Sequence, residues 1–169
     1  MPVLEDISIS LVANYQQVEE ILLQARIQMF SEQMDPYVTP SDLKKFDENY
    51  MAPMGAMWRA CNRAGIAIAT AGYRTYDHRF KHFSLPGKKI VEVTRLYVDP
   101  QYRRLGLATQ LLNQLRQHAV ANHADTLYLH THPFLSGAVD FWESQGFQFI
   151  ERDEDPTWQT IHMVQGDIA

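Results

Sequence analysis

The sequence predicts an α/β domain in which strands alternate with amphipathic helices, and one stretch carries most of that prediction. Residues 91–98 (VEVTRLYV) are rich in β-forming side chains, and the strand must stop at Asp99-Pro100 because proline has no N–H to donate to a ladder. After a short turn, an apolar stripe with helical spacing begins, formed by Ala108, Leu111, Leu112, Leu115 and Ala119. The 169 residues suffice for one domain with a substantial core.

The N-terminal part begins with a predicted strand over residues 7–13 (ISISLVA), where apolar and small polar residues alternate. Asn14 has the residue type of a helix N-cap, and Gln17 three positions later completes a capping-box pattern. The helix that follows is indicated by apolar residues at helical spacing, namely Val18, Ile21, Leu22, Ala25 and Met29. Residues 31–53 are less regular, although Ser41 can cap a short helix there.

A hairpin is predicted from two strands, residues 56–61 and 66–76, joined by the turn sequence NRAG. The next segment, residues 77–89 (DHRFKHFSLPGKK), is polar, basic and broken by Pro-Gly, so we expect a loop. His78 and His82 lie in it without a helix or a third ligand, so the pattern predicts no metal site.

The C-terminal part contains a predicted strand at residues 126–131 (TLYLHT). Ser136 can cap a following helix, which Gly146 ends. Two last strands are predicted at residues 147–150 and 157–164, around an acidic turn.

The composition limits the class of protein. The 20 acidic residues exceed the 15 basic ones, and the net charge of −5 argues against nucleic acid as a partner. Cys61 is the single cysteine, which rules out an intramolecular disulfide framework and predicts a buried small apolar residue. No apolar run is long enough to cross a bilayer, and residues 1–10 lack the features of a signal peptide. We therefore expect a cytoplasmic protein that has no membrane partner.

The turn after the central strand has the residue types of a phosphate seat. Arg103 and Arg104 stand beside Gly106 just before the helix, whose first N–H groups are free and carry a partial positive charge of about half a unit. Such a helix start binds phosphate readily. A dinucleotide-binding loop needs three spaced glycines and a P-loop needs Gly-Lys-Ser/Thr, and neither pattern occurs in the sequence. A basic turn of this size suits a phosphorylated cofactor better than a polymer.

Three segments together resemble the GCN5-related N-acetyltransferase (GNAT) family. Arg103-x-x-Gly106-x-Ala108 is similar to the family pattern Gln/Arg-x-x-Gly-x-Gly/Ala, which holds the pyrophosphate of acetyl-coenzyme A (acetyl-CoA). The preceding EVTRLYVDPQYRR resembles the fourth strand and pyrophosphate loop of the family, and FWESQGFQF resembles its late helix and strand. The resemblance is best over residues 90–164. It implies a single domain over residues 1–169, with a twisted mixed β-sheet flanked by helices and strands four and five splayed apart to admit the coenzyme.

The resemblance also implies site residues. Acetyl-CoA is expected as co-substrate, without a metal. Its pantetheine arm is expected to pair with the backbone of Leu96, Tyr97 and Val98. Its pyrophosphate is expected to be held by Arg103, Arg104, Leu105, Gly106, Leu107, Ala108 and Thr109. Glu92 stands where many relatives carry a glutamate that serves as the general base.

A base is useful because an amine with a pKa near 10.4 is neutral in roughly one molecule in several thousand at pH 7. An exposed glutamate is a weak base, so the role requires that Glu92 be partly desolvated or act through a water molecule. The alternative is that Glu92 is an ordinary surface residue of the strand.

The sequence departs from the family at the group that protonates the leaving thiolate. Trp142 stands where many relatives carry a tyrosine, and an indole N–H does not give up its proton usefully. Either the thiolate leaves unassisted, or Tyr128, His130 or His132 protonates it. An asparagine that is frequent in the family is also missing, with Leu135 near its place.

The sequence thus predicts an N-acetyltransferase that moves the acetyl group directly to a primary amine of a small molecule or peptide, as a monomer or homodimer. The alternative is a catalytically weak acyl-CoA-binding module that regulates a protein partner.

Overall fold

The computed structural model describes residues 3–169. The strands are β1 (Ser8–Leu11), β2 (Gly55–Cys61), β3 (Ala67–Thr75), β4 (Ile90–Val98), β5 (Thr126–Thr131), β6 (Gln148–Arg152) and β7 (Ile161–Gly166). The α-helices are α1 (Glu19–Phe30), α2 (Ser41–Lys44), α3 (Phe46–Tyr50), α4 (Leu107–Ala121) and α5 (Ala138–Ser144). Three short 3-10 turns lie at Leu4–Asp6, Tyr15–Gln17 and Pro100–Tyr102. Every strand and helix that the sequence indicated is present.

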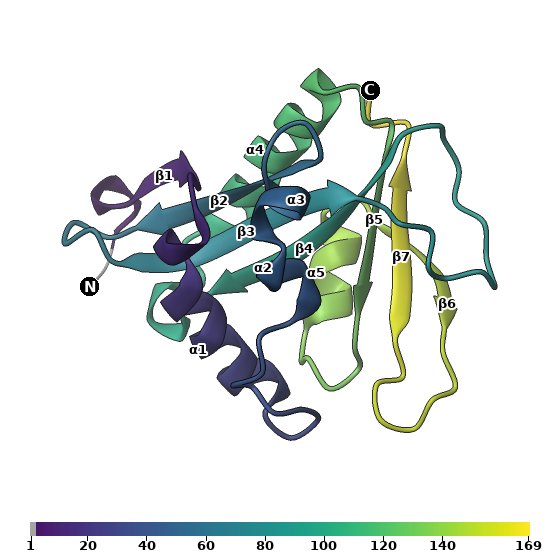
Figure 1. Cartoon of the computed structure of the whole chain (residues 1–169), viewed down its shortest axis with the longest axis horizontal. Helices are drawn as coiled ribbons and strands as arrows, with labels where there is room; N and C mark the ends of the chain where they lie inside the picture. The colour runs from purple at the N-terminus through teal and green to yellow at the C-terminus, as the bar shows by residue number, and fades with distance from the viewer. Residues whose placement is uncertain (1–2) are drawn as a thin grey trace. The chain divides into compact units, whose positions relative to one another are not determined.

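The strands form one mixed sheet in the order β1-β2-β3-β4-β5-β7-β6 (Figure 1). β4 and β5 run parallel, whereas the pairs β1–β2, β2–β3, β5–β7 and β6–β7 are antiparallel. This confirms the predicted α/β class with a mixed sheet flanked by helices. The chain divides into two compact units: unit 1 contains residues up to Arg74 and Val93–His118, and unit 2 contains Thr75–Glu92 and Ala119–Ala169.

Two of the predicted boundaries in front of helices are wrong. Asn14 makes no capping hydrogen bond from its side chain, and α1 begins only at Glu19. Gln17 instead uses its side-chain oxygen to accept the N–H of Ala13 at 2.8 Å, which stabilises the 3-10 turn before the helix. In front of α5 the cap position is held by Gly137 in a left-handed conformation, not by Ser136.

The last strand begins later than predicted, at Ile161. The carboxylate of Asp155 accepts the backbone N–H groups of Thr157, Trp158 and Gln159 at 3.0–3.2 Å. Because these donors are turned toward one carboxylate, they are not available to a ladder, and residues 155–159 form a turn.

Unit 1 has helices packed on both faces of its strands. Neighbouring residues of a strand point to opposite faces. Met57 of β2 is buried in one apolar cluster with residues from α1, α2 and α3, whereas Trp58 packs edge-on against His118 of α4 at 5.1 Å between ring centroids. The stripe predicted for α4 is largely buried, including Leu111, Leu112, Leu115 and Ala119. Cys61 is buried and unpaired, as expected.

Unit 2 is built on β5, β7 and β6, which lie side by side (Figure 1). A cluster of Tyr76, Ile90 and Tyr128 is covered by apolar residues of the segment 77–89, namely Phe80, Phe83 and Leu85. The segment predicted as a solvated loop therefore contributes to the core of this unit.

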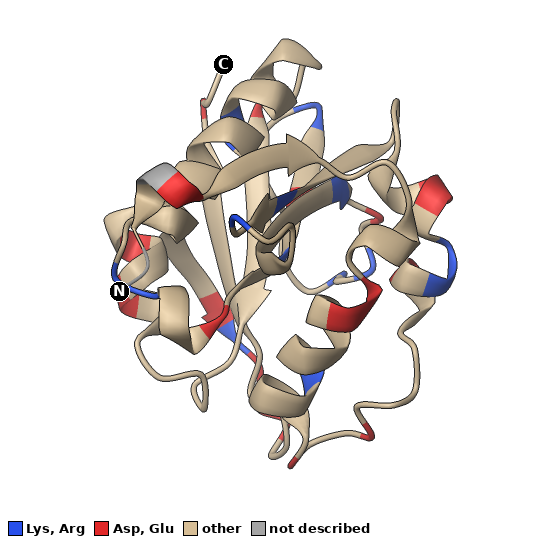
Figure 2. Cartoon of the chain, turned by 90° about the vertical axis from the view of Figure 1, so that its left-hand side faces the viewer, with Lys and Arg blue, Asp and Glu red and all other residues tan. Residues whose placement is uncertain are grey.

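Acidic and basic residues are scattered over helices, strands and loops in the view of Figure 2. The electrostatics of the site therefore depend on individual ion pairs. Among the residues described, no helix combines the length and the apolar character needed to span a membrane.

Candidate active site

The turn that follows β4 is shaped by two left-handed residues. The carboxylate of Asp99 accepts the N–H of Gln101 at 2.9 Å and fixes the 3-10 turn Pro100–Tyr102. Arg104 (φ 65°) and Gly106 (φ 77°) then turn the chain into α4, which begins at Leu107. The first N–H groups of a helix have no acceptor within the helix, so those at the start of α4 lie at this turn and can donate to a ligand there.

Gly106 faces open space. A Cβ atom built at this position meets nothing within 4 Å, and the residue is exposed. The backbone of the turn is thus accessible to a ligand. A glycine suits this position because its positive φ strains other residues and because a side chain here projects into the space that a ligand needs.

Arg103 links the end of β4 to the turn. Its Nε donates to the carbonyl of Val98 at 2.9 Å, and its guanidinium lies 5.9 Å from the ring centroid of Tyr97. The side chain is exposed, so its charge remains at the mouth of the turn. Tyr97 is buried, and its hydroxyl hydrogen-bonds Gln28 of α1. These contacts stabilise the backbone that precedes the turn.

β4 is irregular at Arg95, which has a positive φ of 57°. An ion pair with Asp42 of α2 holds its guanidinium at 2.5 Å, and the hydroxyl of Thr70 on β3 donates to its carbonyl at 2.7 Å. A non-glycine residue in this conformation is uncommon and persists only when its surroundings fix it. The three residues that follow are those predicted to pair with a pantetheine arm, Leu96, Tyr97 and Val98.

The pairing between β4 and β5 is short. Ile90, Val91 and Glu92 of β4 are in register with Thr126, Leu127 and Tyr128 of β5, and among the described residues the register goes no further. The backbone of Leu96–Val98 therefore has no strand partner on β5 within the described part of the chain.

Glu92 is fully buried and bound by Arg79 at both carboxylate oxygens. Arg79 donates to Oε1 at 2.7 Å and to Oε2 at 2.8 Å, while Nδ1 of His130 lies 3.2 Å from Oε2. The His130 contact has the distance of an ion pair but not the geometry of a hydrogen bond. Burial acts to raise the pKa of the Glu92 carboxyl, but Arg79 and His130 outweigh it and hold that pKa well below its usual range.

A carboxylate in this setting accepts a proton poorly. The role of Glu92 as a general base stays a prediction, and in this geometry a direct proton transfer requires that Arg79 first move away. One alternative from the sequence is wrong: Glu92 is not a surface residue of the strand.

Two histidines follow Tyr128 along the chain: His130 lies in β5, and His132 comes just after its end. The side chain of His130 is 31% exposed, while its Nδ1 atom is buried. His132 is buried against the rings of Phe134 and Trp158, which also contact each other, and its Nδ1 lies 3.1 Å from the carbonyl of Trp158.

Comparison with known proteins places the chain in a family. A model of the acetyltransferase (GNAT) family matches residues 15–147, more than half of the chain. The chain belongs to the GNAT acetyltransferase family. A sequence search of curated proteins finds no match.

Solved GNAT structures have the same fold. A GNAT acetyltransferase from Staphylococcus aureus Mu50 is 21% identical, with 95% of this chain and 98% of that chain covered and a TM-score of 0.72. NAA60 from Arabidopsis thaliana, solved in complex with acetyl-CoA, is 14% identical, with 95% and 98% covered and a TM-score of 0.71. The NatC complex bound to Gag peptide and CoA matches at 18% identity, with 95% and 98% covered and a TM-score of 0.69.

In this GNAT protein Trp142 is a packed core residue. It is 8% exposed and makes edge-on contacts with Phe141 at 5.1 Å and with Phe147 at 5.3 Å between ring centroids. Trp142 therefore lies on the buried side of α5. The indole fills the place of the usual tyrosine without offering a titratable hydroxyl.

Sequence reasoning missed a second group of polar residues in unit 2. His82, Asp153 and His162 come from the segment 77–89, from the stretch after β6, and from β7, and their nitrogen and oxygen atoms all lie within 4.8 Å of one another. Because the first of them lies 71 residues before the second, no local spacing signals this cluster.

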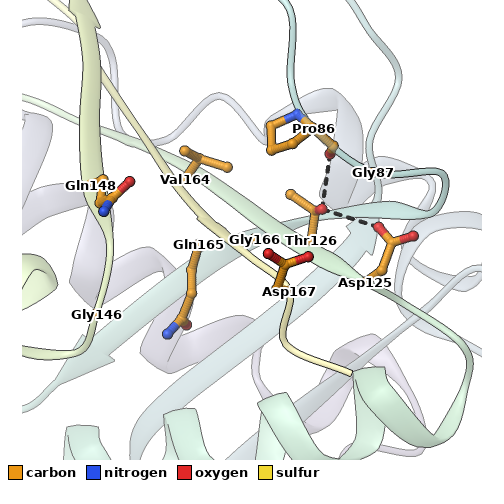
Figure 3. A pocket seen from close by; sticks show the side chains of 10 residues that line it. All are labelled: Pro86, Gly87, Asp125, Thr126, Gly146, Gln148, Val164, Gln165, Gly166 and Asp167. Atoms are coloured by element: carbon orange, nitrogen blue, oxygen red, sulfur yellow. Dashed lines mark hydrogen bonds between the residues drawn. The ribbon is translucent and has the colours of Figure 1, made fainter.

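A polar pocket of about 470 Å³ also lies in unit 2 (Figure 3). Its lining consists of Pro86, Gly87, Asp125, Thr126, Gly146, Gln148, Val164, Gln165, Gly166 and Asp167. None of the predicted coenzyme residues is among them. Asp125 is occupied by the N–H groups of Lys88 and Lys89, so its carboxylate holds the end of the segment 77–89 in place.

We expect stability to fall as the pH falls from about 6.5 toward 4. Burial and the adjacent His130 lower the pKa of His132 to about 4, and burial also lowers the pKa of His162. The unfolded chain takes up these protons first, so His132 costs up to about 1.4 kcal/mol of stability per pH unit in that window, and His162 acts in the same direction. Urea unfolding between pH 7 and pH 5 should show this slope. His132→Phe, which keeps the stacking on Phe134, should flatten it, and an unchanged slope would contradict the assignment.

Proposed function

We propose that this protein transfers the acetyl group of acetyl-CoA directly to a primary amine of a small molecule or peptide. The observation that carries the proposal is the turn from Arg103 to Ala108, where the exposed backbone of Gly106 meets the start of α4. Family membership supports acyl transfer. Two structural neighbours add support, since one was solved with acetyl-CoA and another with CoA and a peptide.

For the coenzyme, we propose two adjoining sets of backbone groups. The N–H groups from Arg104 to Ala108 hold the pyrophosphate, while the N–H of Arg103 donates to the carbonyl of Pro100 within the turn. The charges of Arg103 and Arg104, which are both exposed, add to the field of the helix start. The backbone of Leu96–Val98 pairs with the pantetheine arm, because the described register between β4 and β5 ends before it.

For the proton, we propose that the outer nitrogen of His130 takes it from the attacking amine and that Glu92 positions His130. The carboxylate lies 3.2 Å from Nδ1, so it favours a proton on that nitrogen and leaves Nε2 as the acceptor. The amine nitrogen then bonds to the acetyl carbon while the carbon–sulfur bond breaks. The sulfur leaves as a thiolate, at modest cost because the pKa of a thiol is near 8.5.

Glu92→Gln and His130→Gln should each lower kcat/KM by about 10²–10⁴-fold at pH 7, with a smaller loss near the pKa of the acceptor itself. Both variants must first be shown to fold and to bind acetyl-CoA normally, because Glu92 is also a buried structural ion. If His130→Gln is fully active while Glu92→Gln is impaired, the histidine is not the base. An equal loss at every pH would instead indicate that the pair orients the acceptor.

The test of the function is an amine panel. Purified protein with acetyl-CoA is screened against small cationic amines and peptides of varied N-terminal sequence, with free thiol as the readout and mass spectrometry of the acetylated product as confirmation. We expect turnover with a subset of amines and a product heavier by one acetyl group. Tight binding of acetyl-CoA without turnover on any amine would favour the alternative, an acyl-CoA-binding module that regulates a partner protein.

A further inference from the structure

We propose that unit 2 binds one divalent transition-metal ion of the zinc type through His82, Asp153 and His162, with Glu151 as the fourth ligand. This inference concerns a cluster that the acetyl-transfer proposal does not use, and it stands or falls independently of that proposal.

The donor atoms already converge. Nε2 of His82 and Nε2 of His162 both lie 3.0 Å from Oδ1 of Asp153, and Oε2 of Glu151 lies 3.0 Å from Nε2 of His82. A tetrahedral zinc ion with bonds of 2.0–2.2 Å keeps its ligand atoms roughly 3.3–3.5 Å apart. His82, Asp153 and His162, whose donor atoms all lie within 4.8 Å of one another, therefore need only small shifts to surround an ion, and Glu151 completes the set from its contact with His82.

Glu151 provides a second observation that points to a ligand. Its Oε2 atom is buried yet makes no hydrogen bond within the described residues, even though His82 is close to it. Buried oxygens without hydrogen bonds are rare in native proteins, and coordination to a cation satisfies such an oxygen. Asp153 and Glu151 together carry the two negative charges that a divalent cation neutralises.

His162 is prepared as a ligand. It is fully buried, and its Nε2 atom already lies 3.0 Å from Oδ1 of Asp153. Its other nitrogen, Nδ1, lies 2.5 Å from the hydroxyl of Tyr128. When Nε2 binds an ion, the proton must reside on Nδ1, and the tyrosine hydroxyl can then accept where it otherwise donates. Tyr128 thus orients the ring in either state, as the outer partners of metal-bound histidines do.

The surroundings also fit a bound ion. The rings of Phe80 and Phe83 lie 4.6 Å and 4.7 Å from the ring of His162, and they form an apolar wall around the cluster. His82 is 45% exposed and gives the ion a path of entry. Two imidazoles with two carboxylates favour zinc and similar transition metals over magnesium or calcium, which prefer oxygen ligands alone.

Such an ion would tie the segment 77–89 to β6 and β7. The same segment carries Arg79, the partner of Glu92, so the ion would restrict the motion of the residue that holds the buried carboxylate. The competing possibility is that the four groups only hydrogen-bond to one another and bind no ion.

The experiment is calorimetric titration of chelator-stripped, untagged protein with Zn²⁺. His82→Asn and Asp153→Asn remove a ligand from partly exposed positions, and His78→Asn is the matched control on the same segment. Asparagine tolerates the left-handed backbone of His78. We expect one ion per chain, a loss of affinity of at least about 100-fold in both ligand variants, and wild-type affinity in His78→Asn. Tyr128→Phe should bind Zn²⁺ about 10–100-fold more weakly than the wild type.

Two further readouts separate the outcomes. Co²⁺ should give the visible absorption of a tetrahedral site, and Zn²⁺ should slow hydrogen exchange in residues 77–89 of the wild type but not of His82→Asn. Absence of one-site Zn²⁺ binding in folded wild-type protein would overturn the proposal, as would an equal loss of affinity in His78→Asn. Binding of Mg²⁺ as tightly as Zn²⁺ would also count against it.

Discussion

Replacing Arg79 by methionine is expected to lower the free energy of unfolding at pH 7 by about 3 kcal/mol. The variant keeps the length of the side chain but removes the guanidinium that binds both carboxylate oxygens of Glu92, which is fully buried. Breaking a buried ion pair at one partner typically costs 3–5 kcal/mol because an uncompensated charge remains. We expect the lower end of that range, since the side chain of Arg79 is itself 32% exposed.

The loss should depend on pH in a defined direction. In the wild type the pKa of Glu92 is lowered, so its stabilising contribution is present above the unfolded pKa and is lost as the pH falls through the folded one. In Arg79→Met burial is no longer opposed by the guanidinium, so the pKa of Glu92 should rise. The free-energy cost of the uncompensated charge on Glu92 then disappears as the carboxyl takes up a proton. The difference between the two proteins should therefore be largest near pH 7 and should shrink toward pH 4.

Urea unfolding of Arg79→Met, Glu92→Gln and the double variant provides the test as a double-mutant cycle. The double variant should lose less free energy of unfolding than the two single variants lose together. Arg63→Met is the matched control, because Arg63 pairs with Asp6 while its side chain is 86% exposed, and its loss should stay within about 0.5 kcal/mol. A loss below about 1 kcal/mol for Arg79→Met, or strict additivity in the cycle, would mean that the pair does not hold the buried carboxylate.

The parts of the fold that the sequence predicted well depend on local signals. The strand 91–98, the turn and the stripe of α4 are each specified by neighbours within a few residues, by Pro100 and by Gly106. The proposed coenzyme site could be suggested from the sequence for the same reason, since a helix start and a glycine are local signals.

The parts that were missed depend on contacts that are distant in sequence. Arg79 and His82 lie in a segment whose polar composition predicts a solvated loop, yet Arg79 binds Glu92 and His82 lies beside Asp153, 71 residues away. His162 lies near His82 and Asp153 because β7, which carries it, pairs with β5 and β6. The periodicity of a sequence specifies faces of strands and helices but not which loop covers them, so the buried setting of Glu92 could not be foreseen.

Gly106→Trp is expected to weaken the binding of acetyl-CoA by roughly 10²–10⁴-fold. The proposed seat holds the pyrophosphate through backbone N–H groups, and each charge-assisted hydrogen bond contributes about 1.5–3 kcal/mol, so the loss of two of them gives an effect of this size. An indole at this position projects into the open space in front of the turn, where a Cβ atom meets no protein atom within 4 Å. The fold should therefore survive, apart from the strain of a positive φ, which costs roughly 1–2 kcal/mol.

Gly65→Trp is the control that separates these two effects. Gly65 has a φ of 80°, close to the 77° of Gly106, and a Cβ atom there also meets nothing within 4 Å, but it lies in the turn between β2 and β3. Both variants should lose similar amounts of stability in urea unfolding, whereas calorimetry should show a loss of acetyl-CoA affinity only in Gly106→Trp. The acetyl-CoA affinity of Gly106→Ala should lie between those of the wild type and Gly106→Trp, because alanine adds the same backbone strain with little bulk. If folded Gly106→Trp binds acetyl-CoA as tightly as Gly65→Trp does, then the pyrophosphate does not lie at the start of α4.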